Sequence, residues 1–133
     1  MSAFGISPRD AKYFLPPFEW YNETIAGWTR MAGLTLVNFT PGTYSNADYT
    51  TPSMDGSYHG SDEILRRILE VEQSSPRGLN GYILLLHIGT DPAREDKFAR
   101  KLDALITELQ RRGYLFGTVG EPETWKEHGS TRR

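Results

Sequence analysis

The stretch Tyr-Ile-Leu-Leu-Leu-His, residues 82–87, is the longest nearly apolar run in the chain and decides the expected fold. An uncharged apolar run of this length, closed by a polar residue, is typical of a strand buried on both faces of a parallel sheet. After it come Asp91-Pro92, a helix-start signal, and a second apolar run at Tyr114–Val119. Between them, apolar residues recur at helical spacing: Phe98, Leu102, Leu105, Ile106 and Leu109. The order strand, helix, strand predicts a βαβ unit.

A second unit of the same kind is predicted nearer the N-terminus. Tyr13–Leu15 is expected to be a short strand, and the two prolines that follow it disfavour helix. Asn22 is placed to cap a helix that Gly33 ends, and Leu34–Phe39 is expected to be the next buried strand.

Between the two units lies the polar loop Thr40–Gly60, which is long for a small domain and therefore a candidate functional segment. Ser61 is predicted to cap a third helix after it. The sequence as a whole predicts an α/β fold of about four mainly parallel strands with three helices.

Composition restricts the classes of function. The chain has 133 residues, a formal net charge of -2 and a pI near 5.9, which gives no basic surface for nucleic acid. No apolar run is long enough to cross a membrane, and no N-terminal leader pattern is present. The absence of cysteine removes disulfides, thiol nucleophiles and thiolate metal sites.

The polar residues that end the predicted strands are the candidates for chemistry, because ligands of parallel α/β folds bind beyond those ends. His87 closes an apolar strand, where a partly desolvated imidazole can exchange protons near neutral pH. The alternative is a structural histidine bonded to a neighbouring loop. His59 and the acidic residues around it lack a metal-ligand spacing, so no metal site is predicted.

Two segments together resemble the polysaccharide deacetylases of carbohydrate esterase family 4, the NodB-like deacetylases. Phe14–Asn22, with sequence Phe-Leu-Pro-Pro-Phe-Glu-Trp-Tyr-Asn, is similar to the family's third motif, an Arg-Pro-Pro-Tyr-type turn with a helix-opening asparagine. Leu84–His87 is similar to its fifth motif, the Leu-x-His strand end. The likeness covers about residues 12–121 and implies an incomplete (β/α) barrel, the C-terminal half of such a domain.

The resemblance also implies roles for single residues. His87 would be the catalytic acid that protonates the leaving group, and Leu85 would line the pocket for the acetyl methyl group. Pro17 and Phe18 would form one wall of a substrate groove. Trp20 and Asn38 complete the expected substrate-binding set.

Other parts of the family pattern are absent or altered. Neither the Thr-Phe-Asp-Asp strand nor the His-x-x-x-His helix that bind a divalent metal such as zinc and supply the base occurs in the sequence. The motif arginine is Leu15 here, and Asn38–Thr43 stands where the family has an aspartate-tryptophan segment. The intact relative would therefore carry the metal, and this chain would carry no cofactor.

The leading hypothesis is a deacetylase fragment, residues 1–121, followed by a flexible tail, residues 122–133. It would recognise a carbohydrate polymer or oligosaccharide, be inactive alone, and form a homodimer through the open side of its sheet. A polymer substrate suggests a periplasmic or secreted parent protein. The alternative is a non-catalytic carbohydrate-binding or interaction domain with an aromatic groove, formed by Phe18, Trp20, Tyr44 and Tyr49. A third reading is a complete small α/β protein without either function.

Overall fold

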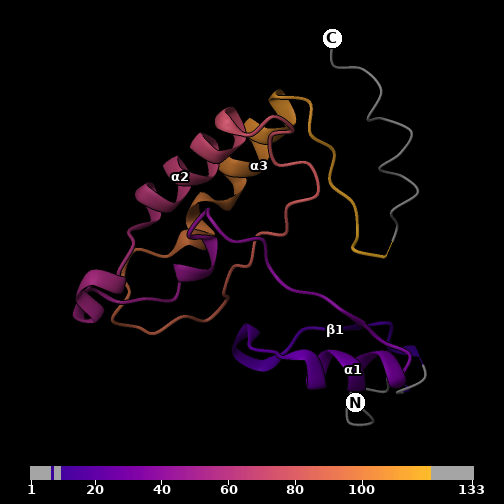
Figure 1. Ribbon diagram of the computed structural model, residues 1–133. Helices are drawn as coiled ribbons and strands as arrows, with labels where there is room; N and C mark the ends of the chain where they lie inside the picture. The colour runs from indigo at the N-terminus through magenta and orange to yellow at the C-terminus, as the bar shows by residue number, and fades with distance from the viewer. Residues whose placement is uncertain (1–6, 8–9, 121–133) are drawn as a thin grey trace.

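The computed structural model describes residue 7 and residues 10–120, and the predicted tail, residues 122–133, lies outside them. Figure 1 shows two separately packed parts of the chain, here called units, and the chain after β2 passes from the first to the second. One unit contains the strands β1 (Tyr13–Phe14) and β2 (Thr35–Leu36) with the helix α1 (Glu23–Met31). The other contains the helices α2 (Ser61–Ser74) and α3 (Leu102–Arg111) with the loops around them.

The first unit is a small βαβ motif. β1 and β2 pair in parallel, with Tyr13 opposite Thr35 and Phe14 opposite Leu36. The side chain of Asn22 accepts a hydrogen bond from the backbone N–H of Ile25 at 3.0 Å, so the predicted helix cap is confirmed. Gly33 follows α1 with a φ of +74°, a conformation that glycine adopts without the strain of a side chain.

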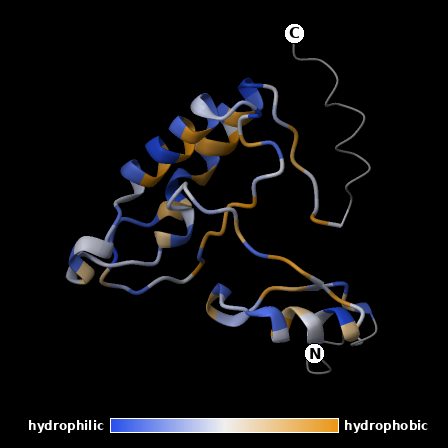
Figure 2. Ribbon diagram, viewed as in Figure 1, coloured by the Kyte–Doolittle hydropathy of each residue, from blue (hydrophilic) through white to orange (hydrophobic). Residues whose placement is uncertain are grey.

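The second unit contains the hydrophobic core. α2 and α3 turn their apolar faces toward each other, as the colouring of Figure 2 shows. Six buried apolar side chains form this core: Ile64, Ile68, Leu79, Phe98, Leu105 and Leu109. Tyr82, Leu84 and Leu86 pack against it from the chain segment between the helices. These three residues belong to Tyr82–His87, the apolar run on which the predicted fold was based.

Tyr82–His87 is not a strand, and the prediction of a central strand there is wrong. Its backbone forms no strand ladder, and two of its N–H groups donate to side chains instead. The N–H of Ile83 donates to the Thr40 hydroxyl at 3.1 Å, and the N–H of His87 donates to the Asp48 carboxylate at 2.8 Å. A single backbone bond, from the N–H of Thr40 to the carbonyl of Ile83, joins it to the chain after β2. The apolar side chains are therefore packed without sheet pairing.

The expected strand Tyr114–Val119 is likewise absent. Tyr114 is held by its side chain, which accepts a hydrogen bond from the N–H of Leu79 and donates one to Glu72. Leu115, Phe116 and Val119 are exposed. The described residues thus form three α-helices and one two-stranded parallel sheet, and the predicted four-strand incomplete barrel of the deacetylase type is wrong.

Two smaller findings concern the long loop and the helix after it. Thr40–Gly60 contains the short 3-10 segments Ser45–Ala47 and Pro52–Ser57. Gly60, not Ser61, is the residue that caps α2. The N–H of Ser61 donates to the carboxylate of Asp96 at 2.5 Å, so a distant side chain serves as the cap. No helix within the described residues is long and apolar enough to span a membrane.

Candidate functional site

His87 and Asp48 form a close pair between the two loops that carry them. The Nδ1 atom of His87 lies 2.6 Å from Oδ1 of Asp48, and the backbone N–H of His87 donates to Oδ2 of the same carboxylate at 2.8 Å. The Asp48 side chain is 1% exposed, whereas the His87 side chain is 33% exposed. One buried carboxylate therefore fixes both the backbone and the ring of a partly exposed histidine.

This geometry assigns the protons of the His87 ring. An ionised carboxylate only accepts hydrogen bonds, so Nδ1 must carry the proton that it shares with Asp48. Nε2 has no hydrogen-bond partner among the described residues. The arrangement is that of an oriented general acid or base.

The ring of Tyr49 completes the surroundings of His87. The two rings meet edge to face, with centroids 5.1 Å apart and an angle of 64° between their planes. Because the neighbouring residue, Asp48, binds Nδ1, two consecutive side chains of one loop contact the same imidazole. Rotation of the ring would break both contacts.

Buried polar residues shape the loop that presents Asp48. Thr43, Ser45, Thr50 and Thr51 are buried together with it. The N–H of Asp48 donates to the carbonyl of Ser45, and the Thr50 hydroxyl donates to the carbonyl of Ala47 at 2.7 Å. These local bonds close a turn in which the Asp48 carboxylate points inward. The turn also contains the Ser45 hydroxyl, which is buried without a hydrogen-bond partner.

The other predicted site residues lie on the βαβ motif. The side-chain amide of Asn38 donates to the carbonyl of Glu19 at 2.8 Å, which joins the end of β2 to the turn Pro17–Glu19. Phe18 and Glu19 both have positive φ angles, a strained conformation for side-chain-bearing residues. The Phe18 side chain is 93% exposed and Trp20 is 65% exposed. Pro17 is exposed beside them.

The six predicted site residues thus fall into two groups, one in each unit. Asn38 is bonded within the turn that carries Pro17, Phe18 and Trp20, while Leu85 and His87 belong to the other unit. Within the described part of the chain, no hydrogen bond, ion pair or ring contact joins His87 to the Pro17–Trp20 segment. The substrate-binding roles expected for these residues stay predictions.

Asp48 is the candidate-site residue that sequence reasoning missed. The segment Asn38–Thr43, which stands where the family has an aspartate-tryptophan segment, contains no carboxylate. The carboxylate comes instead from ten residues beyond Asn38, inside the long polar loop. The available signal was the length of that loop, which had marked it as a candidate functional segment.

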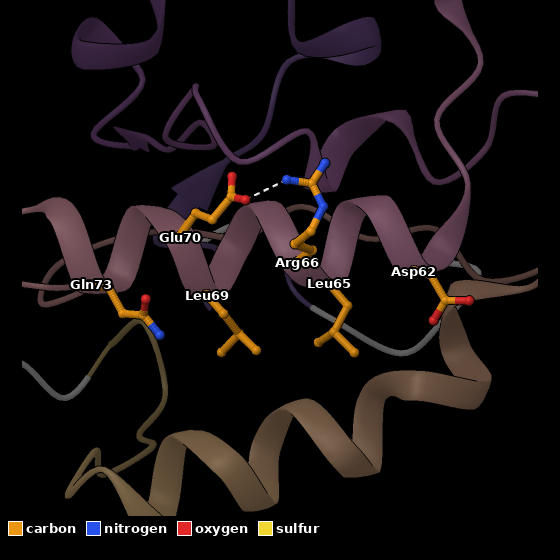
Figure 3. A pocket seen from close by; sticks show the side chains of 6 residues that line it. All are labelled: Asp62, Leu65, Arg66, Leu69, Glu70 and Gln73. Atoms are coloured by element: carbon orange, nitrogen blue, oxygen red, sulfur yellow. Dashed lines mark hydrogen bonds and ion pairs between the residues drawn. The ribbon is translucent and has the colours of Figure 1, made fainter.

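Two hollows elsewhere on the surface do not include the His87–Asp48 pair. One, of about 410 Å³, lies along a single side of α2, where Leu65 and Leu69 point toward α3 and Arg66 is paired with Glu70 (Figure 3). The other is an apolar trough of about 860 Å³ lined by residues from 79–86, α3 and 113–119. Neither hollow is lined by a histidine, so neither contains a histidine–carboxylate pair like His87 and Asp48.

No residues suited to bind a metal are gathered in the described part of the chain. There, no group of three or more His, Asp or Glu side chains is close enough to hold an ion. The two close histidine–carboxylate pairs are His87 with Asp48 and His59 with Glu63, at 2.6 and 3.1 Å. His59 and Glu63 are close enough for an ion pair but are not aligned for a hydrogen bond. Nδ1 of His59 has no hydrogen-bond partner among the described residues.

Comparisons of the chain with protein-family models, with curated proteins and with solved structures found no match in any of the three.

Proposed function

We propose that this chain supplies the proton-donating side of a deacetylase-like hydrolase that removes acetyl groups from N- or O-acetylated carbohydrate. The observation that carries the proposal is the pairing of His87 with Asp48. It gives the residue that resembles the family's catalytic acid the orientation and the buried carboxylate that this role needs. A purely structural histidine would need the bond to the loop, but it would not need a partly exposed ring whose Nε2 has no hydrogen-bond partner among the described residues.

The proposed step is the collapse of a tetrahedral intermediate. As its bond to the leaving nitrogen or oxygen breaks, the electron pair goes to that atom, which takes the proton from Nε2 of His87. The ring returns to its neutral form with its proton still on Nδ1, hydrogen-bonded to Asp48. Leu85, two residues before His87, is proposed to contact the acetyl methyl group.

The metal and the base would come from the family motifs that this sequence lacks, and a divalent metal such as zinc would belong to an intact relative. We therefore expect that the chain alone neither hydrolyses acetylated sugars nor binds zinc tightly, because three protein ligands are the usual minimum of a catalytic zinc site. Calorimetric titration with zinc tests this. Tight one-to-one binding that is lost in His87→Ala would contradict it.

Ligand titration followed by NMR tests the carbohydrate site itself. An oligomer of N-acetylglucosamine should shift the ring signals of His87, and a glucose oligomer of equal length should not. Asp48→Asn should weaken the response, because the amide no longer holds the ring as a charged acceptor does. An unchanged His87 spectrum at saturating oligomer would reject the proposal.

Exposed aromatic side chains favour a second candidate, carbohydrate binding without catalysis. Phe18, Trp20, Tyr44 and Tyr49 are all exposed, and aromatic rings can pack on the C–H faces of sugars. If this function is correct, the oligomer should alter the signals of Trp20. Trp20→Ala should then abolish binding, while Trp28→Ala, at an exposed position of α1, should not.

We also propose that two copies associate through the apolar trough. Its lining contains no charged residue, and Leu115 and Phe116 are exposed at its edge. Light scattering after size exclusion should give twice the monomer mass of 15.1 kDa, and Leu115→Asp should shift the protein toward the monomer. A monomer mass that persists at high protein concentration would exclude the dimer.

A further inference from the structure

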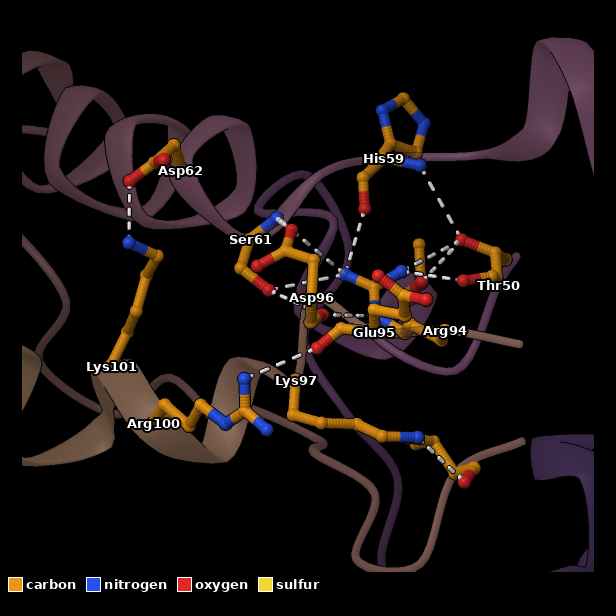
Figure 4. Close-up of polar contacts among 12 residues, drawn as sticks. Thr50, His59, Ser61, Asp62, Arg94, Glu95, Asp96, Lys97, Arg100 and Lys101 are labelled. Atoms are coloured by element: carbon orange, nitrogen blue, oxygen red, sulfur yellow. Dashed lines mark hydrogen bonds and ion pairs between the residues drawn. The ribbon is translucent and has the colours of Figure 1, made fainter. Parts of the chain in front are cut away.

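Arg94 is a fully buried cation that joins three separate segments of the chain. Its Nη1 donates to the carbonyl of Thr50 at 2.6 Å, its Nη2 to the carbonyl of His59 at 3.0 Å, and its Nε to the carbonyl of Asp96 at 2.8 Å. Figure 4 shows the guanidinium at the centre of these contacts. All three guanidinium nitrogens are therefore used.

The burial of this charge requires an explanation, because an unpaired charge in the interior is strongly unfavourable. The carboxylate of Asp96 lies 4.0 Å from Nη2, and the ring of Tyr58 lies 5.3 Å from the guanidinium carbon. The main compensation is the set of carbonyls, which the rigid planar fork of arginine matches and the single ammonium of lysine does not. The site therefore depends on the shape of the guanidinium as well as on its charge.

One of the three tethered segments carries Asp48. Thr50 lies two residues after Asp48, and its backbone N–H and hydroxyl both donate to the carbonyl of Ala47, which closes the turn around the carboxylate. Arg94 holds the carbonyl of Thr50 and approaches its hydroxyl at 3.4 Å. A movement of Thr50 would thus move the turn that points Asp48 at His87.

The segment that carries Arg94, residues 94–97, also contacts the chain just after His87. The ammonium group of Lys97 donates to the carbonyl and hydroxyl of Thr90 and to the carbonyl of Asp91. Thr90 comes three residues after His87. Residues 94–97 therefore contact both loops whose relative position sets the distance between the histidine and its carboxylate.

We propose that Arg94 is a positioning residue for the His87–Asp48 pair: it fixes the Thr50 turn, and through that turn it keeps the Asp48 carboxylate on Nδ1 of His87. The catalytic meaning of this role rests on the proposed function, but the effect of Arg94 on the pair does not. It can be measured without substrate, as the tautomer of the His87 ring.

The test is ¹⁵N NMR of the imidazole nitrogens in the full chain. In the unchanged protein, neutral His87 should be mainly the Nδ1–H tautomer, as it must be to donate to Asp48. Arg94→Lys keeps the positive charge but cannot reach all three carbonyls, so His87 should lose this preference and resemble His87 in Asp48→Asn. Arg100→Lys is the matched control, because Arg100 is exposed and its guanidinium only approaches the carbonyl of Glu95, at 3.4 Å.

A second variant covers the case in which Arg94→Lys does not fold. Thr50→Val leaves Arg94 and the Thr50 carbonyl in place but removes the hydroxyl that bonds Ala47 and approaches Nη1. It should produce a smaller loss of the same tautomer preference. A folded Arg94→Lys or Thr50→Val protein with the unchanged tautomer would overturn the proposal. Because no sugar is added, failure here is distinct from a failure of the carbohydrate titration.

Discussion

The βαβ motif and the helical unit of this chain differ in where their apolar side chains lie. In the βαβ motif, Trp28 and Met31 project from α1 into solvent, and Thr29 is the one buried residue of that helix. In the helical unit, α2 and α3 bury a continuous apolar core, and polar side chains such as Arg94 and Asp48 are buried beside it. The first unit therefore leaves apolar side chains of its helix exposed, whereas the second buries those of both its helices.

This contrast predicts that global stability resides in the helical unit. Ile68→Ala should lower the free energy of unfolding by about 2–5 kcal/mol, because it removes a fully buried side chain and leaves a cavity. Met31→Ala, at a 78% exposed position of α1, should change it by less than about 0.5 kcal/mol. Urea denaturation measures both. Equal effects would mean that the two units do not differ in this way.

The contact between α2 and the segment after α3 gives a sharper test within the helical unit. A Cβ atom at Gly78 would lie 2.0 Å from the hydroxyl oxygen of Tyr114, which bonds both Leu79 and Glu72. Gly78→Ala should therefore be less stable than Gly89→Ala by about 1–3 kcal/mol.

Gly89 is a matched control because its φ is also positive, at +77°, and nothing lies within 4 Å of its Cβ position. Both variants carry the cost of a side chain in the left-handed region, so their difference isolates the collision with Tyr114. Thermal unfolding of the two proteins, measured side by side, gives that difference. If they unfold at the same temperature, Tyr114 does not anchor the segment.

In the βαβ motif the expected effects are local. Asn22→Ala removes the cap of α1 and should destabilise that helix by about 1 kcal/mol. Amide hydrogen exchange should become faster in α1 and stay unchanged in α2, because α1 does not contribute to the α2–α3 core. Thr24→Ala, an exposed change in the same helix, is the control. Faster exchange in both helices would show that the units unfold together.

The smallest predicted effect depends on pH. Hydrogen bonds from Arg111 and Arg112 lower the pKa of Glu108 from 4.5 to about 2. A carboxyl whose pKa is lower in the folded state adds stability above its unfolded pKa, and this contribution is lost as the pH falls from about 5 to about 2. Glu108→Gln should therefore be less stable than the unchanged protein at neutral pH.

That difference should shrink across the same acidic range and vanish near its lower end. Glu95→Gln is the comparison, because the Glu95 carboxylate has no hydrogen-bond partner among the described residues. Its stability should follow that of the unchanged protein from neutral to acidic pH, as measured by urea midpoints. A Glu108→Gln difference that is constant with pH would contradict the assignment to ion pairing.

Sequence reasoning succeeded for some features whose cause is local, although it misplaced the cap of α2 at Ser61 and the start of α3 at Asp91-Pro92. The cap at Asn22 and the end of α1 near Gly33 are set by residues within one helix. It failed for Tyr82–His87, because an apolar run predicts burial but does not reveal whether its N–H groups bond another strand or the side chains of Thr40 and Asp48.

The candidate site was predictable in part for the same reason. His87 was identified because it ends an apolar run, which is a property of neighbouring residues. Asp48 is 39 residues away from it, and Arg94 bonds Thr50 across 44 residues. Such long-range pairings leave no periodic pattern in a single sequence. Tertiary packing determines which polar residue of the long loop turns inward.

The separation of Asp48 and His87 along the chain also has a consequence for folding. Closing a flexible loop of 39 residues costs about 3 kcal/mol in chain entropy, on the (3/2)RT ln n scale. Hydrogen bonds to a charged group contribute about 1.5–3 kcal/mol each, so the two bonds of the pair together contribute about 3–6 kcal/mol, which at its lower end only offsets this cost. We therefore expect the pair to be secure when α2, which lies within that loop, has packed and shortened it. Local unfolding of α2 would then also separate His87 from Asp48. The hydrogen bond that orients the His87 ring would therefore be lost before the chain is fully unfolded.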